Sequence, residues 1–103
     1  MKIYIAGKIT GEKYYKRKFR KIEKKLVKMG HSVMSPAWLG AFSDFSWEDY
    51  MKVSRSMQEV CEVTFFLPDW LDSKGAQEEF LYADKLNHKK FYNINEVPKK
   101  EDV

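Results

Sequence analysis

The chain has 103 residues, of which 44% are hydrophobic and 16% aromatic, enough for one domain with its own core. Its 19 basic and 15 acidic residues leave a net charge of +4, and its single cysteine, Cys61, excludes an internal disulfide. We find no secretory signal, no apolar run of membrane-spanning length and no metal-type cysteine spacing. We therefore expect a cytoplasmic protein with no membrane partner, no metal and no cofactor.

The first third of the chain predicts a strand, a loop and a helix. Lys2 to Gly7 is a short run rich in β-branched and aromatic residues, as in a strand, and GKITG, from Gly7 to Gly11, follows as a loop. Apolar residues then recur every three or four positions from Tyr15 to Met29, which indicates an amphipathic helix. Gly30 stands where a left-handed cap is expected.

The middle of the chain predicts a second strand, a long loop and a second helix. His31 to Pro36 is a short strand closed by a proline, and residues 37–46 form a loop that is long for a compact domain. Ser46 is a suitable N-cap for the helix that starts at Trp47, because two acids follow in its first turn.

The last third predicts a buried strand, a third helix and a final strand. Val63 to Pro68 is continuously apolar, as in a strand covered on both faces. A helix from about Ala76 to Asn87 and a strand from Lys89 to Ile94 follow. The alternation predicts an α/β fold with a small parallel sheet of four or five strands and helices on both faces. We take residues 1–95 as one domain and residues 96–103 as a polar tail with a frayed end.

The loops that follow the predicted strands are the place for a binding site, because parallel sheets bind ligands beyond the carboxyl ends of their strands. These loops contain GKITG, SPAWLG, PDWLDSKG and NINE. In GKITG, two glycines and a helix N-terminus suit an anion, with Lys8, Thr10 and Lys13 adding charge and hydrogen bonds. A plain strand-to-helix turn explains the same residues at least as well.

The basic stretch from Lys13 to Lys28 holds much of the excess positive charge. A basic helix with aromatic residues can indicate nucleic-acid binding. A solvated outer helix face explains the same pattern, and we favour it. Nucleic acid is therefore not an expected partner.

The segment DSKGAQEEF places two adjacent acids near the start of the third helix. Ser73 is a fair N-cap, and the helix dipole alone accounts for acids in a first turn. Glu79 shares a helix face with Gly75 and Ala83, so we expect it to face the cleft, whereas Glu78 turns toward solvent. A carboxylate whose pKa is lowered by backbone N–H groups can act as a nucleophile or a general base.

Three tryptophans and two histidines have structural alternatives. Trp38, Trp47 and Trp70 lie in or beside these loops, where an indole can stack on a base or pack the loop. We favour packing for Trp47 and leave both readings open for Trp70. His31 and His88 lie at the opposite edge of the sheet, and we expect both to be structural.

Three segments together resemble the nucleoside 2-deoxyribosyltransferase-like family: MKIYIAGKITG, GHSVMSP and LPDWLDSKGAQEEFLYA. The resemblance covers about residues 1–94 and is strongest to short bacterial and phage members. It implies a flavodoxin-like three-layer sandwich and chemistry at an N-glycosidic bond of a nucleoside or nucleotide. A glutamate attacks C1 of the sugar, the base leaves, and another base or water resolves the ester. The family glutamate lies four residues after the glycine of S-x-G, which is Glu79 here.

The resemblance also implies how the substrate is held. Family hydrolases of nucleoside 5′-monophosphates carry serine six residues before the glutamate, and this chain has Ser73 there. Ser73 and Lys8 therefore favour a phosphorylated substrate and hydrolysis over transfer. The remaining substrate-binding positions are Gly7, Ile9, Thr10, Gly11, Asp69, Trp70, Gly75 and Asn93.

Two departures from the family pattern bear on catalysis. Lys8 replaces the usual proline of GPITG, and Ser54, beside Arg55, stands where family enzymes carry an aspartate near the sugar. Asp49 or Asp69 could substitute for that acid. The alternative to an enzyme is therefore an inactive nucleotide-binding or regulatory module of the same fold.

A second subunit is also implied. In the family, a C-terminal residue of a neighbouring subunit often completes the site, and Asn93 and Asn95 are the candidates here. Together with an exposed aromatic set, this predicts a homodimer or a higher homo-oligomer.

Overall fold

A parallel sheet of four strands forms the centre of the protein. The structure, a computed structural model, describes residues 1–40 and 44–102, so positions 41–43 of the predicted loop and 103 of the predicted tail lie outside it. The strands are β1 (Lys2–Ala6), β2 (Ser32–Met34), β3 (Val63–Phe66) and β4 (Lys89–Phe91), and their order is β2-β1-β3-β4. All neighbouring pairs are parallel, which confirms the predicted parallel α/β fold.

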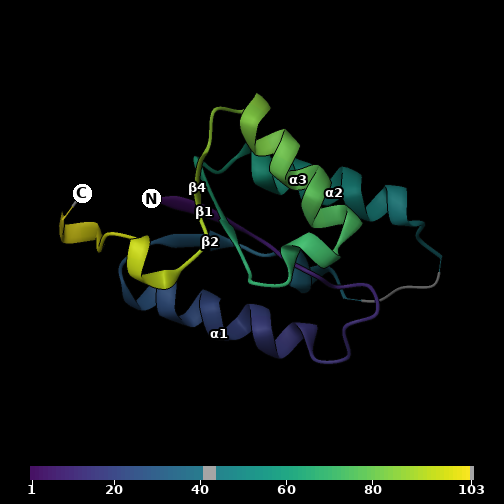
Figure 1. Ribbon diagram of the computed structural model, residues 1–103, viewed down its shortest axis with the longest axis horizontal. Coiled ribbons are helices and arrows are strands. Elements are labelled where there is room, and N and C mark those ends of the chain that lie inside the picture. The colour runs from purple at the N-terminus through teal and green to yellow at the C-terminus, as the bar shows by residue number, and fades with distance from the viewer. Residues whose placement is uncertain (41–43, 103) are drawn as a thin grey trace.

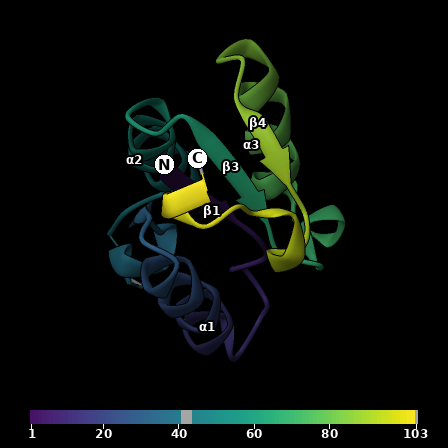
Figure 2. The ribbon, with the colours of Figure 1, turned by 90° about the vertical axis from the view of Figure 1, so that its left-hand side faces the viewer.

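Helices cover both faces of this sheet. Helix α1 (Tyr15–Lys28) lies on one face, and α2 (Trp47–Glu59) and α3 (Lys74–Lys85) lie together on the other (Figures 1 and 2). This is the three-layer, flavodoxin-like arrangement, in which the loops after the strands share one edge. Successive side chains of β1 point to opposite faces of the sheet, so this strand gives each helical layer an apolar surface to pack against.

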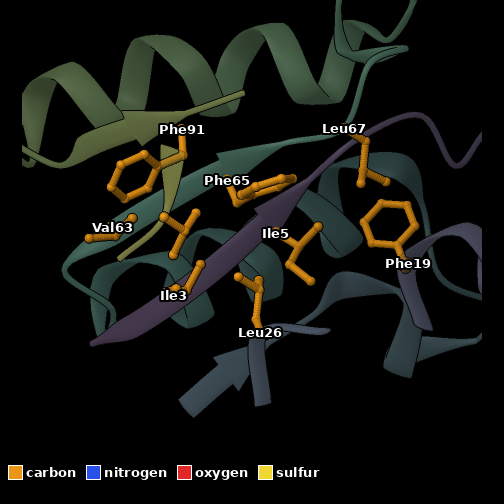
Figure 3. Close-up of a cluster of buried hydrophobic side chains, with 9 residues drawn as sticks. Ile3, Ile5, Phe19, Leu26, Val63, Phe65, Leu67 and Phe91 are labelled. Atoms are coloured by element: carbon orange, nitrogen blue, oxygen red, sulfur yellow. The ribbon is translucent and has the colours of Figure 1, made fainter. Parts of the chain in front are cut away.

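The core on the α1 side is aliphatic and aromatic (Figure 3). Ile3 and Ile5 of β1 pack in one cluster with Phe19 and Leu26 of α1, and none of the four has exposed surface. The periodic pattern that predicted this helix is thus the pattern that buries it. The other buried members of the cluster come from β3 and the residue after it, from β4 and from the last residues of the chain: Val63, Phe65, Leu67, Phe91 and Val97.

The opposite face of the sheet packs against α3 through small residues. Ala76 and Ala83 of α3 are buried against Tyr4, Ala6 and Phe66 of the sheet. Small side chains let the helix approach the strands closely, which brings its N-terminal half to the edge where β1 and β3 end. Strand β3 is buried along its whole length, as its continuous apolar run predicts.

The boundaries differ from prediction in ways that matter for the site. Helix α3 begins at Lys74, not at Ala76, because Ser73 Oγ accepts a hydrogen bond from the Ala76 N–H at 3.1 Å. The two adjacent glutamates therefore lie in its second turn. The predicted 37–46 loop begins with a short 3₁₀ helix, η1 (Pro36–Leu39), and η2 (Trp70–Asp72) precedes α3.

Two predicted helix caps are confirmed. Ser46 and Asp49 form a reciprocal capping box at the start of α2. Gly30 ends α1 with a φ of 96°, the left-handed conformation expected for a C-terminal glycine.

The segment after residue 95 is attached to the domain. Val97 is 5% exposed, and the Lys100 N–H donates to the Met29 carbonyl at 2.9 Å. His31 links both ends of the chain, with Nδ1 at 2.8 Å from the Met1 amino group and Nε2 at 2.6 Å from the Pro98 carbonyl. The predicted fraying of residues 99–103 is therefore wrong at Lys100, while the domain boundary at residue 95 stays a prediction.

Candidate active site

A pocket of about 1020 Å³ lies beyond the carboxyl ends of the strands. Its walls come from the loop after β1, from η1, from the first half of α2, and from the η2–α3 junction with the first half of α3. Its lining includes six of the predicted site residues: Gly7, Ile9, Thr10, Ser73, Gly75 and Glu79.

Glu79 lies at the inner wall of this pocket and is only 4% exposed. The hydroxyl of Tyr4, a fully buried residue of β1, donates a hydrogen bond to Glu79 Oε2. Ser54 of α2 lines the same wall and is also buried. The carboxyl group is thus enclosed by two hydroxyl-bearing residues and faces the pocket.

Burial raises the pKa of Glu79 to about 8. The hydrogen bond from Tyr4, the Ser54 hydroxyl and the charge of Arg55 lower the pKa, but they do not offset the loss of hydration. The predicted lowering of this pKa is therefore wrong. Burial dominates this pKa, and Glu79 also lies in the second turn of α3, beyond the free N–H groups of the helix start.

A buried polar chain fixes the backbone that carries Glu79. Gln58 Nε2 of α2 donates to the Glu79 carbonyl at 2.9 Å and to Thr64 Oγ1 at 3.1 Å. Thr64 Oγ1 in turn lies 2.9 Å from His88 Nδ1. This confirms the structural reading of His88, which helps to hold α2, β3 and α3 together behind the pocket.

Glu78 has a different environment from its neighbour. Its Oε2 pairs with Arg55 of α2 at 2.8 Å, and both side chains are about one-third to one-half exposed. The predicted directions of the two acids are thus confirmed. Because Glu78 does not line the pocket, it is a matched control for any substitution at Glu79.

Ser54, which the sequence resemblance matches to an aspartate of the deoxyribosyltransferase-like family, has a neutral side chain. The Ser54 hydroxyl donates a hydrogen bond to the Met51 carbonyl at 3.2 Å, and Ser54 is only 4% exposed. Neither candidate replacement lines the pocket, since Asp49 caps α2 and Asp69 is engaged elsewhere. The carboxyl groups that do line the pocket besides Glu79 belong to Glu48 and Asp72, which the sequence reading did not select.

The outer part of the pocket combines a helix start, a cation and an indole. Lys74, the first residue of α3, places Nζ 4.6 Å from the ring centroid of Trp47, the first residue of α2. Both line the pocket, and Trp47 packs against Lys74 there, so the packing role favoured for Trp47 stays a prediction. A Cβ on Gly75 would lie 3.2 Å from Met51 Sδ and 3.9 Å from Trp47 Nε1, so this glycine keeps space open between α2 and α3.

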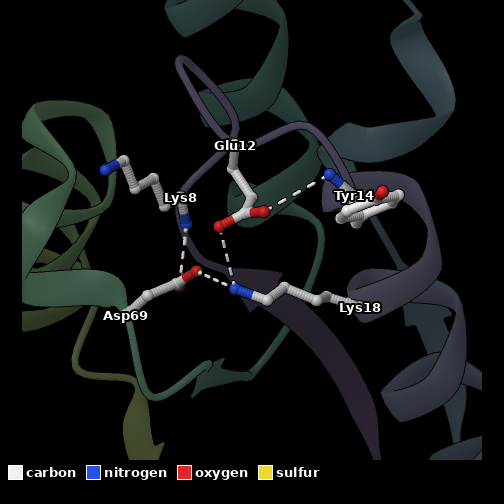
Figure 4. Close-up of polar contacts among 5 residues, drawn as sticks. All are labelled: Lys8, Glu12, Tyr14, Lys18 and Asp69. Atoms are coloured by element: carbon white, nitrogen blue, oxygen red, sulfur yellow. Dashed lines mark hydrogen bonds and ion pairs between the residues drawn. The ribbon is translucent and has the colours of Figure 1, made fainter.

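Lys8 and Asp69 join two loops and do not line the pocket (Figure 4). The Lys8 N–H donates to Asp69 Oδ1 at 3.1 Å, and Lys18 Nζ lies 3.0 Å from both Glu12 and Asp69. The adjacent Gly7 is required by packing, because a Cβ there would lie 2.7 Å from Leu67 Cδ1. The contacts thus fix the GKITG loop to the loop that follows β3.

Three further predicted contacts also lie outside the pocket lining. The Trp70 ring stacks on Phe80, with centroids 4.9 Å apart and planes at 12°. Asn93 Oδ1 accepts from the Asn95 N–H at 3.0 Å and caps a short turn. Gly11 has a φ of 78° with open space around it, as in a turn. Trp70 therefore packs the fold where the sequence left a stacking role open.

Within residues 1–40 and 44–102 no helix has the length and apolarity to span a membrane. In the same residues, no three side chains of the metal-binding types gather into a group that could hold an ion.

Comparison with known proteins agrees with this geometry. The family described as Domain of unknown function (DUF4406) matches residues 1–92. The chain belongs to this family. No curated protein matches this DUF4406 chain. A solved 2-deoxyribosyltransferase from the psychrotolerant bacterium Bacillus psychrosaccharolyticus is similar over 87% of this chain and 69% of that chain, with 25% identity and a TM-score of 0.68. The DUF4406 chain therefore has the nucleoside 2-deoxyribosyltransferase-like fold that its sequence resembles.

Proposed function

We propose that this protein breaks the N-glycosidic bond of a nucleoside or nucleoside 5′-monophosphate, with Glu79 as the nucleophile. One observation carries the proposal. The buried carboxyl group of Glu79 accepts a hydrogen bond from Tyr4 and lines a large pocket beyond the C-terminal ends of the strands. Buried acids with strongly shifted pKa values in a cleft mark candidate catalytic groups. The solved structure of similar fold is that of a 2-deoxyribosyltransferase, which acts on the same type of bond.

The proposed reaction has two displacement steps. The ionised Glu79 carboxylate attacks C1′ of the sugar, the C1′–N bond breaks, and its electron pair leaves with the base, which takes up a proton from water or a pocket carboxyl. Water then attacks C1′ of the sugar ester and returns a proton to the group that protonated the base, which releases the sugar and restores the carboxylate. Tyr4 orients Oε2 in both steps. If a second base takes the place of water, the same steps give transfer.

Hydrolysis of a 5′-monophosphate is the form of this reaction that we favour. Ser73 lines the pocket at the start of α3, where free backbone N–H groups attract a phosphate. Lys74 supplies the cation that the sequence had assigned to Lys8, since Lys74 lines the pocket and Lys8 does not. The carboxylates of Glu48 and Asp72 also line the pocket and would repel the phosphate dianion. Comparing the rates of base release from a nucleoside and from its 5′-monophosphate measures which of the two the protein prefers.

The direct test is release of free base. The protein is incubated with a panel of nucleosides and their 5′-monophosphates, and free base is measured by chromatography. We expect release by the wild type and by Glu78→Gln, and loss of release in Glu79→Gln. Equal rates for Glu79→Gln and the wild type would refute the nucleophile assignment.

A second candidate function is a nucleotide-binding module without turnover. The neutral Ser54 beside Glu79, where family enzymes carry an acid, favours it. Calorimetry distinguishes the two functions. Tight binding of a nucleotide with no base release over a long incubation supports the module, whereas any release that depends on Glu79 supports the enzyme.

We also propose that the protein works as a cytoplasmic homodimer. Three exposed apolar side chains support association: Leu71 at 64%, Leu81 at 67% and Tyr92 at 42% exposure. Asn93 and Asn95 follow Tyr92 and would reach a neighbouring subunit in such an assembly. Light scattering after size-exclusion chromatography measures the mass directly, and a monomer at micromolar concentration would contradict this proposal.

A further inference from the structure

A second groove, of about 440 Å³, lies between α1 and η1. Helix α1 contributes Lys16, Arg17, Arg20 and Glu23 to it, and η1 contributes Ala37 and Trp38. We call it the α1–η1 groove. It is separate from the pocket of Glu79, because Pro36 of η1 lines that pocket, whereas Ala37 and Trp38 line this groove.

The groove lies on the most positively charged part of the chain. Nine lysines and arginines and a single glutamate occur between Lys13 and Lys28, against a net charge of +4 for the whole sequence. Lys16, Arg17 and Arg20 are exposed. Among the described residues these three form no ion pair, unlike Lys18, whose charge is taken up by Glu12 and Asp69.

Trp38 places a fixed aromatic ring beside these cations. Its indole Nε1 donates to Glu23 Oε1 at 2.7 Å, which holds the ring over the groove, yet the residue is 54% exposed. An indole anchored by its polar atom and left open to solvent is suited to stack on a planar partner. Glu23 thus holds the ring in place, and its negative charge is outnumbered by the three cations that line the same groove.

We propose that the α1–η1 groove binds single-stranded nucleic acid. The phosphates would contact Lys16, Arg17 and Arg20, and an unpaired base would stack on Trp38. Cations along a groove with an interleaved aromatic ring are the combination that single strands require, because every base offers a stacking face and every nucleotide a charge. The sequence favoured a solvated face for this helix because it did not place Trp38 beside the arginines. The inference is independent of the chemistry proposed for Glu79.

The test measures binding of a fluorescein-labelled oligothymidylate of about 20 nucleotides by fluorescence anisotropy over a range of KCl concentrations. The variant Arg17→Ala/Arg20→Ala removes two groove cations, and Lys21→Ala/Lys25→Ala is its matched control, because it removes the same charge from exposed positions of α1 outside the groove. We expect the groove variant to lose about tenfold in affinity at low salt. Its slope of log K against log salt should fall by about 0.7 for each lost phosphate contact, with a smaller loss for the control.

The aromatic contact is tested separately. Trp38→Ala should lose about tenfold in affinity, and Trp38→Phe should retain most of it, because a phenyl ring still stacks. Circular dichroism confirms that each variant is folded.

Several results would overturn the proposal. These are no binding at low salt, an equal loss in the groove and control variants, or no difference between Trp38→Ala and Trp38→Phe. Binding to phosphatidylserine vesicles in place of the oligonucleotide would also overturn it, and would indicate a membrane-surface role for the basic helix.

Discussion

Replacing the buried Glu79 by glutamine should stabilise the protein in a pH-dependent way. Glutamine has the size of glutamic acid, and its carbonyl can still accept the hydrogen bond from Tyr4, but it does not ionise. In the wild type, burial raises the pKa of Glu79 to about 8, against an ordinary value of 4.5 for a free glutamate side chain. Between these two values the folded state holds a proton that the unfolded state has lost.

The sign and size of the effect follow from that difference. Because the folded state binds more protons, the stability of the wild type falls as pH rises through this window, by about 1.4 kcal/mol per pH unit and by about 5 kcal/mol in total. The glutamine variant lacks this loss. Its advantage over the wild type should be near zero at pH 4.5, grow to about 3 kcal/mol at pH 7, and level off above pH 8.

Urea unfolding at pH 5, 6, 7, 8 and 9 measures this advantage, since all other titrating groups are shared by the two proteins and cancel in the difference. Glu78→Gln is the matched control: its side chain is about one-third exposed and paired with Arg55, so its effect should stay below about 1 kcal/mol at every pH. A difference between Glu79→Gln and the wild type that does not change with pH would refute the reasoning.

Three other variants test the pocket. In the wild type, kcat/KM should rise with pH and level off above pH 8, as Glu79 ionises. Tyr4→Phe removes a hydrogen bond that lowers the pKa of Glu79, so this rise should move to higher pH. An unchanged pH profile would contradict this expectation. Lys74→Ala should raise KM about tenfold for a nucleoside 5′-monophosphate and little for the nucleoside, in steady-state assays of base release. Gly75→Ala should change stability by less than about 1 kcal/mol but raise KM several-fold, because the added methyl group lies between Met51 and Trp47; chemical unfolding and kinetics measure the two effects.

The fold followed from the sequence because its signals are local and repeated. The apolar spacing from Tyr15 to Met29, the continuous run of β3 and the caps at Gly30 and Ser46 each specify one element, and their alternation specifies a parallel sheet. The contrast between the two glutamates was also predictable, because Glu79 lies one turn after Gly75 and one turn before Ala83 on the same helix face. That face meets the sheet.

The electrostatics of the site could not be predicted in the same way. Whether a carboxyl is ionised depends on neighbours far away in the chain, and Glu79 meets Tyr4 of β1 and Ser54 of α2 only after folding. Burial of the carboxyl between α3, β1 and α2 reverses the expected pKa shift, and the residues near Glu79 in the chain do not reveal that burial.

The tryptophans show the same limit. All three lie near the functional edge in sequence, yet Trp70 stacks inside an aromatic cluster, Trp47 lines the pocket and Trp38 lies in a separate basic groove. Side-chain direction in irregular segments depends on tertiary contacts, which have no periodic signal in the sequence.

The central claim is that the Glu79 carboxylate attacks the sugar, and intact-mass spectrometry tests it most directly. The protein is incubated with a 2′-fluoro-2′-deoxynucleoside and its 5′-monophosphate, whose fluorine slows the second displacement, and the labelled peptide is then mapped. We predict one added sugar on the peptide that contains Glu79, no label in Glu79→Gln, and full labelling in Glu78→Gln. A sugar on another residue, or base release by the wild type that persists in Glu79→Gln, would contradict the account.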